Sequence, residues 1–223
     1  MSQNRLTKES KSNSIFVKNL LWLLIGILLL PSSSWAKNDL YDYLKTIGGD
    51  FTLTNHFGEK TSLKDYQGKT VLLFFGYLNC PDVCPTALIG IKMALRQLKD
   101  EERKKTQVLF ITVDPDRDDS QFMKEYLEAF DSSFIGLRGS TEEIAKVGKQ
   151  YNIRYFKEQI KSESEYNVAH STTLYLIGAD GSVKDLLSHP ANQTYLAKRL
   201  REELNHGGKK QSSPILDRLK NFF

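Results

Sequence analysis

The stretch that decides the fold is Val71-Leu-Leu-Phe-Phe-Gly-Tyr-Leu-Asn-Cys-Pro-Asp-Val-Cys-Pro-Thr86. Its first five residues form an apolar run with β-branched and aromatic side chains, which is typical of a strand buried on both faces. A turn with the only two cysteines of the chain, Cys80 and Cys84, follows, and Pro85 opens a helical pattern. The thiols are therefore expected where a buried strand feeds a helix N-terminus, whose free N–H groups favour thiolate over thiol.

This cysteine pair leaves two interpretations open. Outside the cytosol, a lone pair of cysteines most often forms a structural disulfide. Residues four apart on a helix are about 6 Å apart, which a disulfide can bridge, but closing so short a loop adds little stability. Pro85 also disfavours helical geometry at Cys84. We therefore expect the pair on a loop and a first helical turn, and we favour reversible thiol chemistry.

The N-terminal segment has the pattern of an export signal. Basic residues precede the apolar run Leu20–Leu30, and Pro31–Ala36 follows with a small-x-Ala cleavage pattern. The run has 11 residues, whereas a membrane-spanning helix needs roughly 20. Cleavage after Ala36 is therefore favoured over a membrane anchor. In both cases the domain is expected to be exported, to the periplasm or to the outer face of the inner membrane.

The charge balance excludes one class of partner. The whole chain has 31 basic and 27 acidic residues, and removing residues 1–36 would leave 27 and 26. A near-neutral domain lacks the basic excess of a nucleic-acid-binding protein, so no nucleic-acid partner is expected. We divide the chain into a leader or membrane anchor (1–36), a linking segment (37–49), one α/β domain (50–205) and a polar link with an amphipathic tail (206–223).

The remaining patterns alternate between strands and helices. Asp50–Gly58 alternates with period two and ends in a turn, which predicts a β-hairpin. The helical pattern Thr86–Lys99 separates two buried strands, and this β-α-β order implies parallel pairing. Further expected elements are a capped turn at Ser62–Asp65, strands at Val108–Val113, Phe134–Leu137, His170–Ile177 and Gly181–Leu187, helices at Ser120–Phe130, Ser140–Tyr151 and Thr194–Leu204, and an inserted hairpin or mobile loop at Asn152–Val168.

Four other features are given ordinary structural roles when taken alone. His56 is expected to be an exposed polar residue near a turn, and Met93 a core residue rather than a metal ligand. The turn Asp114–Asp119 follows a strand, where open α/β folds collect functional groups, but a helix cap is the favoured role. His170, without further information, is interpreted as a structural histidine.

Four short motifs change that interpretation. They are Phe75-Gly76-Tyr77 leading to Cys80-Pro-Asp-Val-Cys-Pro-Thr86, then Val113-Asp-Pro-Asp-Arg-Asp118, then Gly139-Ser140 before a helix, and Val168-Ala-His-Ser171 before Tyr175-Leu176. In this order and spacing the chain resembles the Sco/SenC family from about Asp50 to Leu204. The resemblance implies a thioredoxin-like fold, with a central mixed sheet flanked by helices, an N-terminal hairpin and an inserted hairpin before the last strands.

The resemblance also implies a metal site and a function. The family's metal ligands map onto Cys80, Cys84 and His170, and the family delivers copper to the binuclear copper A centre of cytochrome c oxidase. The implied partners are the copper A subunit and an upstream copper donor, and we expect a monomer. The family usually has Asp just before the histidine, where this chain has Ala169. This difference puts in doubt any role of an acidic group next to the ligand, but not the ligand itself.

Donor chemistry agrees with this implied site. Two thiolates hold Cu(I), and an added imidazole gives a set that accepts both copper oxidation states. Without a fourth protein ligand, a closed structural zinc site is not expected. We therefore expect a metallochaperone rather than an enzyme.

Two other functions remain open. The first is a thiol-disulfide reductase that keeps the acceptor's cysteines reduced, with Cys80 and Cys84 as its redox-active disulfide. The three residues between these cysteines, where a typical thioredoxin motif has two, weaken that interpretation. The second is a peroxidase of the same fold, for which no sequence feature beyond the fold gives support.

Overall fold

A computed structural model describes residues 42–158, 161–162, 165–188 and 192–206 of the chain. The predicted leader and the amphipathic tail lie outside these residues. Within them, no helix is both long enough and apolar enough to cross a membrane.

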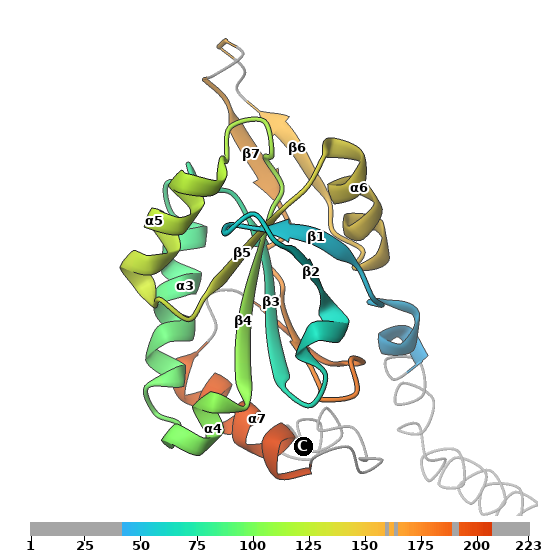
Figure 1. Cartoon of the computed structure of the whole chain (residues 1–223), viewed down its shortest axis with the longest axis vertical. Helices are drawn as coiled ribbons and strands as arrows, with labels where there is room; N and C mark the ends of the chain where they lie inside the picture. The colour runs from blue at the N-terminus through green and yellow to red at the C-terminus, as the bar shows by residue number, and fades with distance from the viewer. Residues whose placement is uncertain (1–41, 159–160, 163–164, 189–191, 207–223) are drawn as a thin grey trace, which may run out of the picture. The chain divides into compact units, whose positions relative to one another are not determined.

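The described strands form a seven-stranded sheet and a separate two-stranded sheet (Figure 1). Their order in space is β2-β1-β5-β4-β3-β8-β9 in the first and β6-β7 in the second. The central strands β3, β4 and β5 are parallel, and the strands outside them pair antiparallel. The strands are β1 (Thr52–Asn55), β2 (Lys60–Ser62), β3 (Thr70–Gly76), β4 (Thr106–Thr112), β5 (Ile135–Arg138), β6 (Tyr155–Glu158), β7 (Asn167–His170), β8 (Leu174–Ile177) and β9 (Val183–Leu187).

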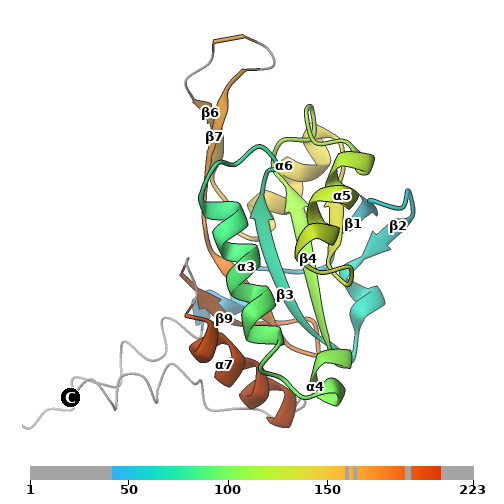
Figure 2. The same cartoon turned by 90° about the vertical axis from the view of Figure 1, so that its left-hand side faces the viewer.

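Helices cover both faces of the larger sheet. Figures 1 and 2 place α3 and α5 on one face and α6 on the other, and α7 packs against α3. The helices are η1 (Leu63–Tyr66), α3 (Val83–Leu95), α4 (Asp100–Lys104), α5 (Ser120–Phe130), α6 (Thr141–Gln150) and α7 (Gln193–His206), and residues 42–46 of the described chain are also helical. This architecture confirms the predicted mixed sheet flanked by helices, with an N-terminal hairpin (β1–β2) and an inserted hairpin (β6–β7).

The core is centred on β3, as its apolar sequence predicts. All seven residues of β3 are buried, and it pairs with β4 from Thr70↔Thr106 to Gly76↔Thr112. Phe74, Phe75 and Phe110 have no exposed surface. A strand that is buried on both faces needs helices on both faces of the sheet. The crossover from β3 through α3 to β4 covers one of these faces.

Local signals in the sequence form the expected turns and caps. Ser62 and Asp65 make a capping box at η1, and Ser140 and Glu143 make one at α6. The Asp119 carboxylate accepts a hydrogen bond from the Phe122 N–H and caps α5. These motifs satisfy N–H groups that lack partners inside the helices, which explains why they can be read from short spacings.

Two element boundaries differ from the predictions. Helix α3 begins at Val83, two residues before Pro85. Proline is tolerated there because N–H groups in the first turn have no partner within the helix. His170 was expected at the head of a strand, but it is the last residue of β7, and residues 171–173 separate it from β8.

Two predicted environments are wrong. His56 is buried, with 6% of its surface exposed. Its ring packs against β5, where its Nδ1 accepts a hydrogen bond from the Gly136 N–H at 2.9 Å. Met93 is 39% exposed, because α3 buries the face that carries Leu88, Ile91 and Leu95. Both errors come from tertiary neighbours that local patterns do not specify.

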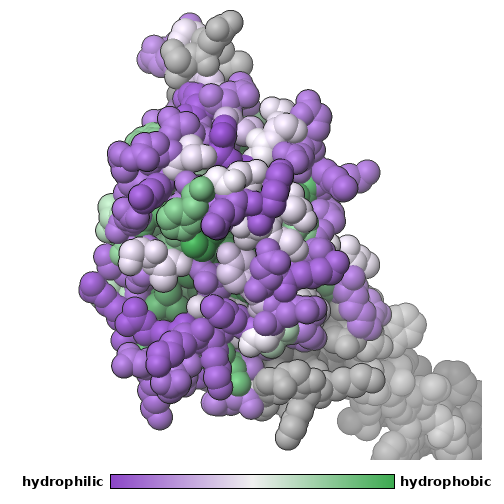
Figure 3. Space-filling view, viewed as in Figure 1, coloured by the Kyte–Doolittle hydropathy of each residue, from purple (hydrophilic) through white to green (hydrophobic). Residues whose placement is uncertain are grey.

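The face of the molecule drawn in Figure 3 is mostly hydrophilic, and its apolar side chains gather in small separate areas. The exposed large hydrophobic residues among those described are Tyr43, Phe57, Ile89, Met93, Phe122 and Phe156. They belong to several elements, as expected for scattered surface residues.

The buried His56 predicts a pH dependence of stability. Burial lowers the pKa of His56 below its usual value of 6.5, so the folded state favours the neutral ring. Its contribution is therefore fully present above about pH 6.5 and is lost as the pH falls below that value. The substitution His56→Asn keeps an acceptor for the Gly136 N–H without a titrating ring. Urea unfolding between pH 7.5 and 5.5 should show the parent losing free energy of unfolding relative to His56→Asn. Parallel curves would contradict this assignment.

Candidate metal centre

Three side chains from two distant regions of the sequence meet at one end of β3. Cys80 lies in the loop after β3, Cys84 is the second residue of α3, and His170 closes β7. Their ligand atoms, two sulfurs and one ring nitrogen, all lie within 4.8 Å of one another. Among the described residues this is the one group of three or more His, Cys, Asp or Glu side chains placed to share a metal ion.

The close approach of α3 to β3 depends on a glycine. A Cβ atom added to Gly76 would lie 2.7 Å from Cys84 Sγ and 2.9 Å from Phe110 Cε2. Such distances are shorter than van der Waals contact, and both neighbours are packed in the core. Gly76 therefore lets the sulfur of Cys84 rest against the end of the central strand.

The two cysteines are free thiols in different electrostatic environments. The Cys84 N–H, at the start of α3, donates a hydrogen bond to Cys80 Sγ at 3.5 Å. Hydrogen bonding from the Cys84 thiol holds the pKa of Cys80 well below its usual value, and His170 and backbone N–H groups act in the same direction against burial. The same contact and burial raise the pKa of Cys84. Cys80 is therefore the thiolate of the pair, and Cys84 keeps its proton until a metal displaces it.

His170 presents a defined nitrogen to the cysteines. Its Nε2 lies 3.4 Å from Cys84 Sγ, and its Nδ1 lies 2.9 Å from the carbonyl oxygen of Ser171. That carbonyl oxygen can only accept, so Nδ1 is the donor to it, and Nε2 is the nitrogen that faces the sulfurs. A ring that gave Nε2 to a metal would carry its proton on Nδ1. The ring of Tyr77 packs edge-on against the imidazole at 5.7 Å between centroids.

The Asp118 carboxylate holds the backbone of the cysteine loop by a hydrogen bond, a role that the sequence analysis did not predict. Its Oδ2 accepts hydrogen bonds from the Leu78 N–H at 3.0 Å and from Thr112 Oγ1 at 2.5 Å. Burial raises the pKa of Asp118 to about 6. Helix capping, the favoured role of the turn, is carried by Asp119 alone. The sequence feature that could have pointed to this role of Asp118 is the position of the turn, which follows the carboxyl end of a buried strand, beside the cysteine loop.

The donor set fits a copper ion. Two sulfurs and a neutral imidazole are soft and borderline ligands, and they suit Cu(I) and Cu(II). Cys84 is fully buried and Cys80 is 8% exposed, so the site is screened from water. The described residues contribute no fourth His, Cys, Asp or Glu to the group, which disfavours a closed zinc site.

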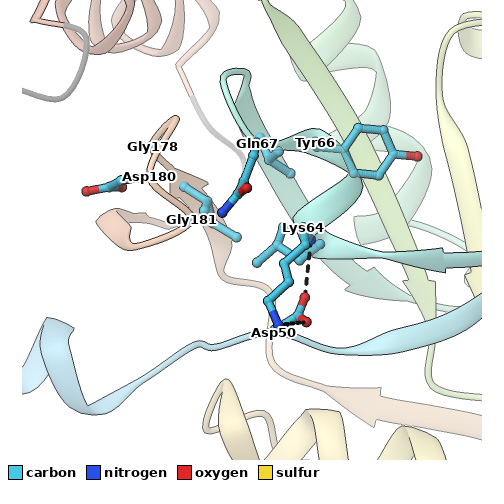
Figure 4. A pocket seen from close by; sticks show the side chains of 10 residues that line it. Asp50, Lys64, Tyr66, Gln67, Gly178, Asp180 and Gly181 are labelled. Carbon is cyan, nitrogen blue, oxygen red and sulfur yellow. Dashed lines mark hydrogen bonds and ion pairs between the residues drawn. The ribbon is translucent and has the colours of Figure 1, made fainter.

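A cavity of about 130 Å³ lies apart from this cluster, at the opposite end of β3. It is bounded by Val71 at the start of β3 and Ile177 at the end of β8. Lys64 Nζ forms an ion pair with Asp50 Oδ2 at 2.9 Å on its wall (Figure 4). Its lining in the described chain includes no cysteine or histidine, so it offers no soft donors for copper.

Comparison with known proteins agrees with this geometry. The family model described as SCO1/SenC matches residues 41–205. The chain belongs to this family. A SCO2 homolog from Danio rerio, named as mitochondrial, is 36% identical over 157 residues, which cover 70% of this chain and 56% of that protein. The chain thus spans little more than half the length of this curated relative.

Solved structures of the family share the fold. The copper-bound structure of Bradyrhizobium japonicum ScoI is 38% identical with a TM-score of 0.65, and the match covers 71% of this chain and 99% of that one. Copper-bound yeast Sco1 is 30% identical with a TM-score of 0.65, covering 75% and 97%. The predicted membership of the Sco/SenC family and its thioredoxin-like fold are therefore confirmed.

The unequal environments of the cysteines predict unequal reactivity. In the reduced, metal-free protein, iodoacetamide at pH 6.5 should alkylate Cys80 before Cys84, since Cys80 is the thiolate and Cys84 is fully buried. Mass spectrometry of digested samples over time measures the order, and Cys84→Ser provides the rate of Cys80 alone. Equal labelling of both cysteines would contradict the predicted order.

The contact of Gly76 predicts that even a methyl group disturbs the site. Gly76→Ala should lower the free energy of unfolding by about 1–3 kcal/mol, as overpacking of a core does. It should also weaken Cu(I) binding, since the added Cβ displaces Cys84 Sγ. Urea unfolding and competition with a chromophoric Cu(I) chelator measure the two effects. If Gly76→Ala keeps the parent's free energy of unfolding and Cu(I) affinity, the end of β3 and helix α3 can move apart at this contact without cost, and the prediction is wrong.

Proposed function

We propose that this chain is a copper metallochaperone that delivers copper to the binuclear copper A centre of cytochrome c oxidase. The observation that carries the proposal is the meeting of Cys80 Sγ, Cys84 Sγ and His170 Nε2 within 4.8 Å. The cysteines and the histidine are 86 residues or more apart in sequence, so their convergence is a property of the fold. In this proposal these three residues are the copper ligands.

The ligand set suits a carrier better than a permanent site. Three protein ligands leave a position open, through which an incoming ligand from an acceptor can enter before the first one leaves. The two sulfurs hold Cu(I), and the imidazole extends the set to Cu(II). Copper is the cargo here, and the fold keeps the donors in place for its arrival and departure.

The relatives support this proposal. The copper-bound structures of ScoI and yeast Sco1 share the fold over most of the domain. We infer by analogy that the partners are an upstream copper donor and the copper A subunit of the oxidase. The export pattern of residues 1–36 supports a location in the periplasm or on the outer face of the inner membrane.

A second candidate function follows from the state of the cysteines. Cys80 is a thiolate beside the protonated Cys84, which is the arrangement that attacks a disulfide. Cys80 would form a mixed disulfide with the acceptor, and Cys84 would then resolve it after losing its proton. The acceptor's disulfide gains two electrons from the pair and two protons, one from Cys84 and one from water, and Cys80 and Cys84 become a disulfide. This reaction does not require His170 as a ligand.

The substitution His170→Ala distinguishes these functions. Loss of a ligand should weaken Cu(II) binding by more than about 100-fold, because even changes around the ligands cost about 10–100-fold. Cu(I) binding should weaken less, since both sulfurs remain. Disulfide reduction should change little. Isothermal titration, chelator competition and an insulin-reduction assay measure the three quantities. Unchanged copper affinity in both oxidation states would show that His170 is not a ligand.

Spectroscopy of the bound metal tests the ligand set directly. Anaerobic titration of the reduced full chain should saturate at one copper per protein. X-ray absorption at the copper edge should then show two sulfur neighbours and one nitrogen. A protein that binds no copper but reduces disulfides would instead establish the thiol-disulfide reductase.

A further inference from the structure

We propose that the turn from Asp114 to Asp118 is a bracket that sets the distance between the cysteine loop and His170, with Arg117 as its main positioning residue. The inference rests on the proposed copper site, because it names the residues that hold two of its segments in register. It adds side chains that neither donate to the metal nor touch it.

The need for such a bracket comes from the topology. Cys80 and Cys84 follow β3, the central strand of the seven-stranded sheet, whereas His170 ends β7. Within the described chain β7 is hydrogen-bonded to β6 alone, in a separate sheet. Figure 2 shows this hairpin extending beyond the body of the larger sheet. The nearest ladder pair that joins this segment to the cysteine strand is Phe74↔Leu174, between β3 and β8, and residues 171–173 separate it from His170. Ladder bonds therefore limit the position of His170 but do not set it alone, and other contacts complete the task.

Arg117 makes the first connection, to the hairpin. Its Nε donates to Asp114 Oδ2 at 2.6 Å, and its Nη1 donates to the carbonyl oxygen of Tyr166 at 2.8 Å. The guanidinium also stacks on the ring of Tyr166, with Cζ 3.6 Å from the centroid. Tyr166 returns a hydrogen bond from its hydroxyl to Asp114 Oδ1 at 2.7 Å. Tyr166 lies four residues before His170, so this closed network holds the strand that carries the imidazole.

The network is buried, which makes its geometry matter. The side chains of Arg117 and Asp114 are only 14% and 1% exposed. A charge pair shielded from solvent is far less screened than a surface pair, and the planar guanidinium fixes orientation as well as distance. The exposed ion pair between Lys157 and Asp116, at 3.1 Å, joins the same hairpin and turn but belongs to the weak surface class.

Asp118 makes the second connection, to the cysteine loop. Its carboxylate accepts from the Leu78 N–H, two residues before Cys80. The Asp118 and Arg117 N–H groups both donate to the Asp114 carbonyl, at 3.0 and 3.2 Å. The hydrogen-bonded turn Asp114–Asp118 therefore contacts the cysteine loop through Asp118 and the β6–β7 hairpin through Arg117. Tyr77 fills the space between, with its ring against His170 and 5.8 Å from the Arg117 guanidinium.

The substitution Arg117→Lys tests the bracket. Lysine keeps a positive charge beside the buried Asp114 but cannot also reach the Tyr166 carbonyl and stack on its ring. In the full chain, Cu(II) affinity should fall by about 10–100-fold, the cost of losing support around a metal ligand, and Cu(I) affinity should fall less. Tyr166→Phe, which removes only the hydroxyl, should show a smaller loss of the same kind. Arg138→Gln is the matched control, because Arg138 donates to the Pro115 carbonyl of the same turn from β5. It should retain parental Cu(II) affinity.

A double-mutant cycle separates positioning from general structural damage. If Arg117 acts through His170, the double variant Arg117→Lys/His170→Ala binds Cu(II) as weakly as His170→Ala and no more weakly. If the fold-losses of Cu(II) affinity in the two single variants multiply in the double variant, the proposal is wrong. A measurement on the copper-free protein distinguishes failure of the bracket proposal from failure of the proposed copper site. Nuclear Overhauser contacts between the Tyr77 and His170 rings should weaken in reduced Arg117→Lys and persist in Arg138→Gln. Unchanged ring contacts in Arg117→Lys would also overturn the bracket, whatever copper does.

Discussion

The parallel pairing of β3 with β4 is the constraint on which the rest of the structure depends. The pair is in register through Gly76↔Thr112, and the Val113 N–H extends it by donating to the Gly76 carbonyl at 2.8 Å. Because parallel strands end at the same edge, the segment with the thiols and the segment with Asp118 must emerge side by side. Buried phenylalanines on both strands make any slip of this register costly.

The electrostatics of the site follow from this junction. A neighbouring thiol and a helix N-terminus stabilise the negative charge on Cys80, while the hydrogen bond to Cys80 and burial keep Cys84 neutral. The backbone carbonyl of Ser171 lies beside Nδ1 of His170 and leaves Nε2 facing the sulfurs. A metal bound by both sulfurs would displace the proton of Cys84, and the proposed ligand set would then hold two thiolates and one imidazole. The site is prepared for a soft cation before one arrives.

Features encoded locally could be predicted, and features that depend on distant neighbours could not. The apolar run of β3, the capped turn at Ser62 and the helix that starts at Ser140 use residues close in sequence, and all three were predicted from spacing. The burial of His56 required knowledge that β1 pairs with β5, which no local pattern contains. His170 alone gave no sign of its role. Only its place within a set of ordered motifs connected it to the cysteines, and the roles of Arg117 and Asp118 emerged only from the folded chain.

The separation of the two sheets has a thermodynamic consequence. The sulfurs lie on elements whose exposure requires breaking the core, whereas the imidazole lies on a two-stranded sheet, which is marginal by itself. Opening of the network around Arg117 would free this hairpin while the core of the larger sheet stays intact, so its free energy lies below that of global unfolding. Movement of the hairpin alone would withdraw one donor and leave the dithiol intact. In the proposed copper site, the ligand shell is thus divided into a rigid pair and a detachable member, and copper could pass from three donors to two without unfolding of the domain.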